Sequence, residues 1–254
     1  MVHDNFVWGE GQKWDFSDVK LLVEEFYELY LTRPIKSNTH GMKSVHLFWT
    51  WYALRKLDPG TVIESGVYKG LGTWMIEKAC PKAKIYSIEP NNLNIEYYAY
   101  NAEYYTKDFS LIYWDEITDI GNTVCFFDDH QDAYERLLQM KFMGFKKAIF
   151  EDNYPAKQGD CYSLNKIFHN SGFVTDEVII PPNDVHAKYV RDNVASYMVF
   201  PPLFKKEKTR WHDGWNDVDY PTPSPIFDRA DTPILRLFEE EADSYTWICY
   251  AELK

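Results

Sequence analysis

Residues 61–90 read TVIESGVYKGLGTWMIEKACPKAKIYSIEP, and this stretch decides the fold. An apolar run that contains Val62 and Ile63 stops at a glycine-rich segment, a helix-compatible segment follows, and a second apolar run, Ile85–Ile88, ends on Glu89. This order predicts a strand, a glycine turn, a helix and a second strand with a carboxylate at its tip, which is typical of sites for nucleotide-like cofactors. Glycines let the backbone approach a ligand closely, and the carboxylate can accept hydrogen bonds from both ribose hydroxyls. We therefore expect an adenosine-type cofactor here.

The residues of the turn narrow the choice of cofactor. They read ESGVYKGLG, with wider glycine spacing than the G-x-G-x-x-G of a dinucleotide site. Glu64 stands at the strand end, where its charge would repel a pyrophosphate but would suit an ammonium group. S-adenosylmethionine has an ammonium group and no phosphate. A turn that only closes a corner between strand and helix is the structural alternative. The residues that we expect to bind the cofactor are Glu64, Gly66, Tyr68, Gly70, Gly72, Thr73, Glu89 and Asp115.

Composition limits the classes of protein that fit. A chain of 254 residues with 45% apolar content suits one α/β domain with some extra elements. The net charge of −12 argues against a nucleic-acid partner, because binding phosphates needs a basic face. No apolar run is long enough to span a membrane, and the first residues, MVHDNFVWGEGQ, lack the pattern of a signal peptide. The four cysteines have no C-x-x-C spacing, so we expect reduced, structural cysteines and a cytoplasmic protein.

Strand-like and helix-like segments alternate along the chain, which predicts a doubly wound, mostly parallel α/β sheet. We expect a helical lead-in and loop over residues 1–58, a main domain over 59–254, and a long surface loop or lid near 201–233, where Pro, Asp and Trp are frequent. Besides the segments above, the expected helices are Phe16–Leu31, Lys43–Leu57, Leu93–Tyr104, Ala133–Lys141 and Ser163–Asn170. The expected further strands are Phe109–Trp114, Thr123–Phe127 and Lys147–Phe150, with Val194–Phe200 and Tyr245–Leu253 as a closing pair.

Acidic residues follow two of these strands in matching positions. Asp128, Asp129 and His130 follow the fourth strand, and Glu151, Asp152 and Asn153 follow the fifth. Both tips lie at the same edge of a parallel sheet, so the carboxylates would repel one another unless a cation neutralised them. A hard divalent ion such as Mg²⁺ or Mn²⁺ fits such oxygen ligands. The alternative is that both acidic pairs only cap the helices that follow, where Asp and Asn are favoured.

The glycine turn and the D-H and D-N pairs together resemble the metal-dependent, class I O-methyltransferases that use S-adenosylmethionine. Both the catechol type and the sugar-modifying macrocin type share this pattern. The ESGVYKG turn and the upstream R-P-x-x-x-N-x-x-G-M at 33–42 are more similar to the macrocin and rhamnosyl group. The likeness covers roughly residues 32–160. It implies a Rossmann-like class I methyltransferase fold with an antiparallel closing strand, in which 59–254 is the methyltransferase domain.

The resemblance also implies roles for the acidic residues. Asp129, Asp152 and Asn153 match the metal ligands, and Asp128 takes the place of Asp129 if the strand register differs by one. Catechol-type enzymes have a lysine as base three residues after the first metal aspartate, where this chain has Asp132. We expect His130 to be the base instead, beside the catalytic Asp129.

We therefore expect an O-methyltransferase that acts on a hydroxyl of a sugar or glycan, with a catechol-like phenol as the alternative acceptor. An NAD-dependent dehydrogenase or epimerase, and a binding module without turnover, are hypotheses of other classes. The expected partner is a small-molecule or glycan acceptor, with no nucleic acid and no membrane. Whether the chain forms a homo-oligomer is left open.

Overall fold

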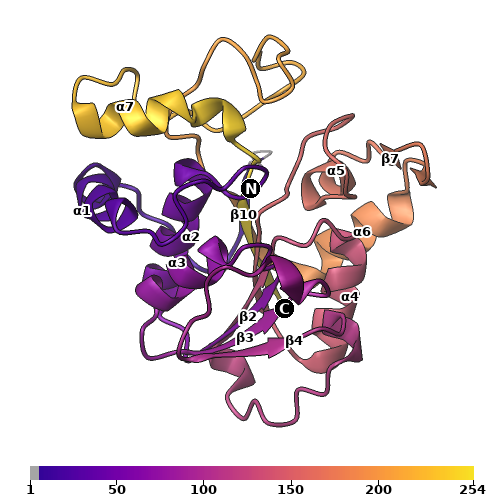
Figure 1. Ribbon diagram of the computed structural model, residues 1–254. Coiled ribbons are helices and arrows are strands. Elements are labelled where there is room, and N and C mark those ends of the chain that lie inside the picture. Colours follow the sequence, from indigo (N-terminus) through magenta and orange to yellow (C-terminus); the bar gives the residue numbers. More distant parts are fainter. Residues whose placement is uncertain (1–5) are drawn as a thin grey trace.

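The computed structural model describes residues 6–254, which form an eight-stranded sheet with helices on both faces and a separate two-stranded sheet (Figure 1). The order of the large sheet is β1-β9-β10-β6-β5-β2-β3-β4. Its strands are β1 (Val7–Gly9), β2 (Thr61–Ser65), β3 (Lys84–Ile88), β4 (Ala102–Tyr105), β5 (Thr123–Phe127), β6 (Lys147–Phe150), β9 (Val194–Val199) and β10 (Cys249–Leu253), and β7 (Phe173–Val174) pairs with β8 (Ile179–Ile180).

The topology confirms the predicted Rossmann-like, doubly wound sheet. Strands β2 to β6 are parallel to one another, and β10 runs antiparallel between β6 and β9. The chain builds outward from β2 through β3 to β4, then crosses back to β5 on the other side of β2. The order of strands therefore reverses between β2 and β5, and such a switch point is where ligands bind in open α/β sheets.

Two hydrophobic clusters cover the two faces of the sheet. Val62 and Val124 belong to the cluster under α1, α2, α3 and α7, whereas their chain neighbours Ile63 and Cys125 belong to the cluster under α4, α5 and α6 (Figure 1). Central parallel strands are thus buried on both faces. The helices are α1 (Val19–Leu31), α2 (Ser44–Leu57), α3 (Leu71–Ala79), α4 (Ala133–Met143), α5 (Leu164–Phe168), α6 (Asp184–Asn193) and α7 (Pro233–Glu240).

The prediction for residues 93–114 is wrong. The third parallel strand is β4, inside the segment that was expected to be a helix, and the segment Phe109–Trp114 is no strand. Glu96 and Tyr97 donate their backbone N–H groups to the carbonyl of Lys69, which holds this segment extended along the glycine turn instead of coiled. Phe109 opens a short 3₁₀ turn and is buried with Trp114 against the sheet.

The remaining segments differ less from the prediction. β5 and β6 have the expected bounds, and β9 and β10 form the expected closing pair. The segment 201–233 contains no helix or strand before Pro233, but it is anchored to the core by the buried rings of Phe204, Trp215 and Tyr220. Helices α6 and α7 were not predicted. None of the helices in residues 6–254 combines the length and apolar character that crossing a membrane requires.

Candidate functional site

The glycine turn between β2 and α3 depends on left-handed backbone. Gly66 has φ +97° and Gly70 has φ +94°, and Tyr68 adopts φ +51° between them. A Cβ on Gly66 would overlap the carbonyl oxygen of Asp128, and one on Gly70 would overlap the carbonyl oxygen of Tyr97. These two positions therefore require glycine both for conformation and for space.

Glu89, at the tip of β3, holds this turn in place. Its Oε2 accepts hydrogen bonds from the backbone N–H groups of Tyr68 (2.7 Å) and Val67 (3.3 Å), and its Oε1 accepts one from Asn91 (2.9 Å). Each carboxylate oxygen has two lone pairs, so the group retains capacity for a ligand's hydroxyls. Glu89 is half-buried and lines a cavity beside the turn.

This cavity lies at the switch point of the sheet and measures about 390 Å³, within the range of small-molecule sites. Its walls come from the ends of β2, β3 and β5 and from the loops beside them. Carboxylates dominate the charged lining, and its basic residues are Arg136 and two histidines. The lining residues are His40, Gly41, Ser65, Gly66, Tyr68, Ile88, Glu89, Pro90, Asp108, Asp128, Asp129, His130, Gln131 and Arg136.

Several residues expected at the cofactor do not line this cavity. Glu64 is completely buried, and its Oε2 accepts hydrogen bonds from Thr73 Oγ1 (2.6 Å) and Ser87 Oγ (2.7 Å). Its Oε1 has no hydrogen-bond partner within residues 6–254. Burial raises the pKa of Glu64 to about 7 against the lowering effect of these two hydroxyls. Gly72 packs against this carboxylate, and Asp115 lies exposed in a loop, because the strand expected before it does not form.

Three side chains meet at the ends of β5 and β6. One ligand atom each of Asp128, His130 and Asp152 lies within 4.8 Å of the others. His130 Nδ1 is 3.6 Å from Asp152 Oδ2 and 2.9 Å from Asp160 Oδ1. Burial and repulsion by Glu151 raise the pKa of both Asp128 and Asp152, and the hydrogen bond that His130 makes to the carboxylate of Asp160 raises the pKa of His130 to about 9. We call Asp128, His130 and Asp152 the acidic group.

Two predicted ligands do not join the acidic group. Asp129 turns its Oδ2 to Arg136, with 3.0 Å to Nε and 2.8 Å to the second terminal nitrogen. Asn153 is wholly buried in the core, where its Nδ2 donates to Tyr197 Oη and the carbonyl of Trp247, and its Oδ1 accepts from the backbone of Asn165. The alternative register, with Asp128 as the ligand-type residue, is the one that the structure brings to Asp152.

Asp132 is a helix cap. Its Oδ1 accepts hydrogen bonds from the backbone N–H groups of Tyr134 (2.8 Å) and Glu135 (3.4 Å) at the start of α4. This geometry matches the capping role that Asp residues commonly have at helix N-termini.

The arrangement fits a divalent cation. Asp152 Oδ2 is buried and lacks a hydrogen-bond partner among the described residues, which is costly for a polar atom unless something else satisfies it. Asp128, His130 and Asp152 offer two carboxylates and an imidazole, a mixed set that Mg²⁺ or Mn²⁺ accepts. A cation there would also relieve the repulsion that raises the pKa of both aspartates.

Sequence reasoning missed the partners of several side chains around the site. Glu151, directly before Asp152, is buried and paired with His46 of α2 at 2.8 Å. Burial favours the neutral form of Glu151, but this pair lowers its pKa to about 2. His46 Nε2 also lies 2.6 Å from the carbonyl oxygen of Ser244. No spacing signal in the chain predicts this pair, because its members come from distant segments; Asp108, Arg136 and Asp160 were missed for the same reason.

No protein-family model and no curated protein matches this chain by sequence. Solved structures with a similar arrangement include an SAH-bound methyltransferase of Podospora anserina, 13% identical with a TM-score of 0.36, over 57% of this chain and 74% of its own. A putative caffeoyl-CoA O-methyltransferase from Staphylococcus aureus is 17% identical with a TM-score of 0.34, over 69% and 79%. An O-methyltransferase from Bacillus cereus in complex with SAH is 11% identical with a TM-score of 0.37, over 70% and 81%. At these low identities and TM-scores, the neighbours decide neither the activity nor the substrate of this chain.

Proposed function

We propose that the protein is an S-adenosylmethionine-dependent O-methyltransferase that uses a divalent metal ion. The observation that carries this proposal is the cavity at the glycine turn. Glu89 offers acceptors for ribose hydroxyls, and Asp108, Asp128 and Asp129 make the remaining charged lining mainly negative. Such a lining attracts a cofactor with a sulfonium and an ammonium group and repels one that carries phosphates.

A dinucleotide cofactor fits this turn poorly. In dinucleotide sites the pyrophosphate rests on the N-terminus of the helix after the turn. Here that N-terminus is Gly70, and the peptide of Tyr97 packs against it so closely that even a Cβ would overlap. The backbone of Glu96 and Tyr97 is bonded to Lys69 at the same place. A dinucleotide would have to share this N-terminus with the segment 96–97, which makes the dehydrogenase or epimerase hypothesis the less favoured one.

The acidic group supplies the chemistry next to the cofactor cavity. Methyl transfer from a sulfonium needs an acceptor oxygen held in line with the methyl carbon and deprotonated as it attacks. Asp128 and Asp152 would hold the metal ion, which when bound would act as a Lewis acid and lower the pKa of the acceptor hydroxyl. His130 lines the cofactor cavity and can accept the proton of that hydroxyl at its ring nitrogen, with Asp160 orienting the ring.

For the acceptor we propose a hydroxyl of a sugar or glycan. Tyr154 follows Asp152 by two residues, and Trp211 of the long loop packs edge-on against its ring at 5.8 Å. Trp211 also stacks with Trp247 and Tyr220, and it is the half-buried ring of a cluster whose other rings are buried. A partly exposed aromatic ring of this kind suits both sugar rings and flat phenols, and a catechol-like phenol is the alternative acceptor.

The experiment is a methyl-transfer assay with radiolabelled S-adenosylmethionine and a panel of glycosides and catechols. We expect transfer to a glycoside, loss of transfer in EDTA, and recovery with Mg²⁺ or Mn²⁺. Thermal unfolding with S-adenosylhomocysteine or NAD, each in excess, tests the cofactor separately, because a ligand that binds the folded state raises the melting temperature. Stabilisation by NAD alone would overturn the proposal, and full activity in EDTA would remove the metal from it.

A further inference from the structure

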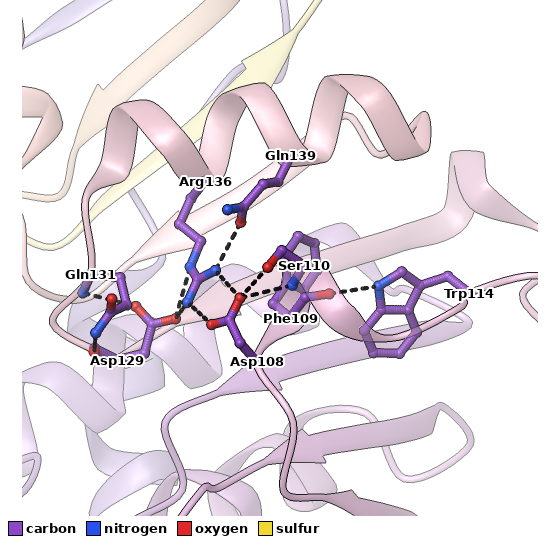
Figure 2. A network of polar contacts seen from close by, with 8 residues as sticks. All are labelled: Asp108, Phe109, Ser110, Trp114, Asp129, Gln131, Arg136 and Gln139. Atoms are coloured by element: carbon purple, nitrogen blue, oxygen red, sulfur yellow. Dashed lines mark hydrogen bonds and ion pairs between the residues drawn. The ribbon is translucent and has the colours of Figure 1, made fainter.

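Arg136 joins two carboxylates that lie on different walls of the cofactor cavity (Figure 2). The side chain comes from α4 and is only 4% exposed. Its terminal nitrogens contact both oxygens of Asp108 at 3.1 and 2.7 Å, while Nε and one terminal nitrogen contact Asp129 Oδ2 at 3.0 and 2.8 Å. Gln139 accepts a further hydrogen bond at 2.8 Å. The guanidinium therefore has nearly all its donors occupied by the bridge.

Each aspartate also accepts hydrogen bonds from a residue two positions further along its own loop. Asp108 Oδ1 accepts from the N–H and hydroxyl of Ser110, and Asp129 Oδ1 accepts from the N–H of Gln131 (Figure 2). The bridge thus ties the loop after β4 to the end of β5 across the cavity. Charge-assisted bonds of this forked kind are strong and geometrically specific.

The bridge also decides which of two consecutive aspartates reaches the acidic group. Asp128 and Asp129 both follow β5, and either could in principle approach Asp152. Asp129 lies near His130 and Asp152, but its Oδ2 is bound by Arg136, and Asp128 is the one of the two aspartates whose ligand atom groups with theirs. Without Arg136, Asp108 and Asp129 would be two facing anions with no cation between them, and repulsion would favour moving Asp129 away.

We propose that Arg136 is a positioning residue: it holds Asp129 in the wall of the cofactor cavity and thereby keeps it out of the metal-binding acidic group. This inference rests on the proposed metal- and cofactor-dependent function. It assigns Asp129 a role in shaping the cofactor site and not in binding the metal.

The test measures binding, not turnover, on the purified full chain. Calorimetry with MnCl₂ and separately with S-adenosylhomocysteine would compare wild type with Arg136→Met, Asp129→Asn, Asp128→Asn and the double variant Arg136→Met/Asp129→Asn. Arg55→Met is the matched control, because Arg55 pairs with Glu25 on the surface far along the chain from the site. Circular dichroism and melting temperature report folding.

We expect Asp128→Asn to weaken Mn²⁺ binding at least tenfold and Asp129→Asn to leave it within about twofold. Arg136→Met should weaken binding of S-adenosylhomocysteine at least tenfold and tighten Mn²⁺ binding about fivefold, since the released Asp129 adds a carboxylate to the acidic group. The double variant should return the Mn²⁺ affinity to that of wild type, which a merely structural role of Arg136 would not produce.

Loss of Mn²⁺ binding in Asp129→Asn would overturn the inference. This measurement tests the role of Asp129 even if Arg136→Met does not fold. Unchanged affinities for both ligands in a folded Arg136→Met would overturn it as well. If the wild-type protein binds no Mn²⁺, the proposed function is wrong about the metal. If the wild type binds Mn²⁺ but Arg136→Met changes neither affinity, the proposed function stands and only the role of Arg136 is wrong.

Discussion

The backbone of Gly66 and the carbonyl oxygen of Asp128 are in such close contact that any side chain on Gly66 would overlap that oxygen. Two hydrogen bonds flank the contact, from Gly66 N–H to the carbonyl of Ile88 and from Asp128 N–H to the carbonyl of Ser65. The glycine turn and the first residue of the acidic group are thus packed as one unit. A change in the turn must therefore affect the acidic group directly.

Gly66→Ala should destabilise the protein by on the order of 2–4 kcal/mol, because it combines a left-handed backbone with an overlap against main-chain atoms. Chemical denaturation measures this loss. Gly214→Ala is the control: nothing lies within 4 Å of its added Cβ, so its stability should stay within about 0.5 kcal/mol of wild type. Equal stabilities of the two variants would contradict the assigned contact.

Glu89→Ala should weaken binding of S-adenosylmethionine by roughly 1–3 kcal/mol. The ribose hydroxyls would lose a charged acceptor, and the N–H groups of Val67 and Tyr68 would lose the partner that shapes the turn. Calorimetry with S-adenosylhomocysteine measures the change. Glu103→Ala removes a similar but exposed acid, one that pairs with Lys84 outside the cavity, and should leave affinity unchanged. Wild-type affinity in a folded Glu89→Ala protein would refute the ribose assignment.

Glu64 makes the stability of the ligand-free protein depend on pH. Its pKa in the folded state is about 7, above the ordinary value of 4.5, so the folded chain binds this proton more tightly than the unfolded chain. Stability is therefore full below pH 4.5, falls as pH rises towards 7, and is constant above that. Glu64→Gln imitates the protonated group and should be more stable than wild type at pH 8 by on the order of 1–3 kcal/mol, with little difference at pH 4.5. Denaturant midpoints at both values measure this. A destabilised Glu64→Gln at pH 8 would mean that the charged form is the one that the core stabilises.

The central fold could be predicted because local signals and burial agree there. Strands such as Thr123–Phe127 are continuous apolar runs, since they are buried on both faces, and acids or glycines end them. Between residues 93 and 105 the signals conflict, because Tyr97, Tyr100 and Tyr104 recur at helical spacing whereas Tyr98 and Tyr100 are two residues apart, as in a strand. Contacts with Lys69 and Glu77, distant in sequence, then decide the backbone.

The position of the candidate site could be predicted from the sequence, but the contacts of its side chains could not. The tips of β5 and β6 do meet, as matched acidic ends indicate. Asp129 is held by the buried Arg136 of α4, and Asn153 is held in the core by Tyr197. Neither contact has a local sequence signal. The resemblance gave Asp129 as a ligand with Asp128 as the alternative, and Asp128 is the one of the two that the structure groups with Asp152.

Asn153→Ala should act on stability and not on metal binding. The substitution leaves Tyr197 Oη, the carbonyl of Trp247 and the N–H of Asn165 without their buried partner, which costs on the order of 2–4 kcal/mol. Denaturant unfolding measures that loss, and calorimetry with MnCl₂ at low temperature should give wild-type affinity. Asp152→Ala should do the opposite. It should abolish Mn²⁺ binding, and it should keep or raise stability because it removes a buried carboxyl group. Abolished Mn²⁺ binding in folded Asn153→Ala protein would restore Asn153 as a ligand.

His130→Ala should lower kcat by ~10²–10⁴, the usual loss of a general base, while the affinity for S-adenosylhomocysteine stays nearly unchanged. Because its pKa is raised to about 9 by Asp160, His130 must lose a proton before it acts, so kcat/KM of the wild type should rise with pH. Asp132→Ala is the matched comparison: it removes a helix cap, should cost about 1 kcal/mol of stability, and should keep turnover. The assay uses a defined acceptor with metal in excess, so that any loss of metal affinity in His130→Ala is compensated. If Asp132→Ala is inactive and His130→Ala is active, Asp132 is the base. If both variants turn over at nearly the wild-type rate, the metal ion alone lowers the pKa of the acceptor hydroxyl enough, and no side-chain base is needed.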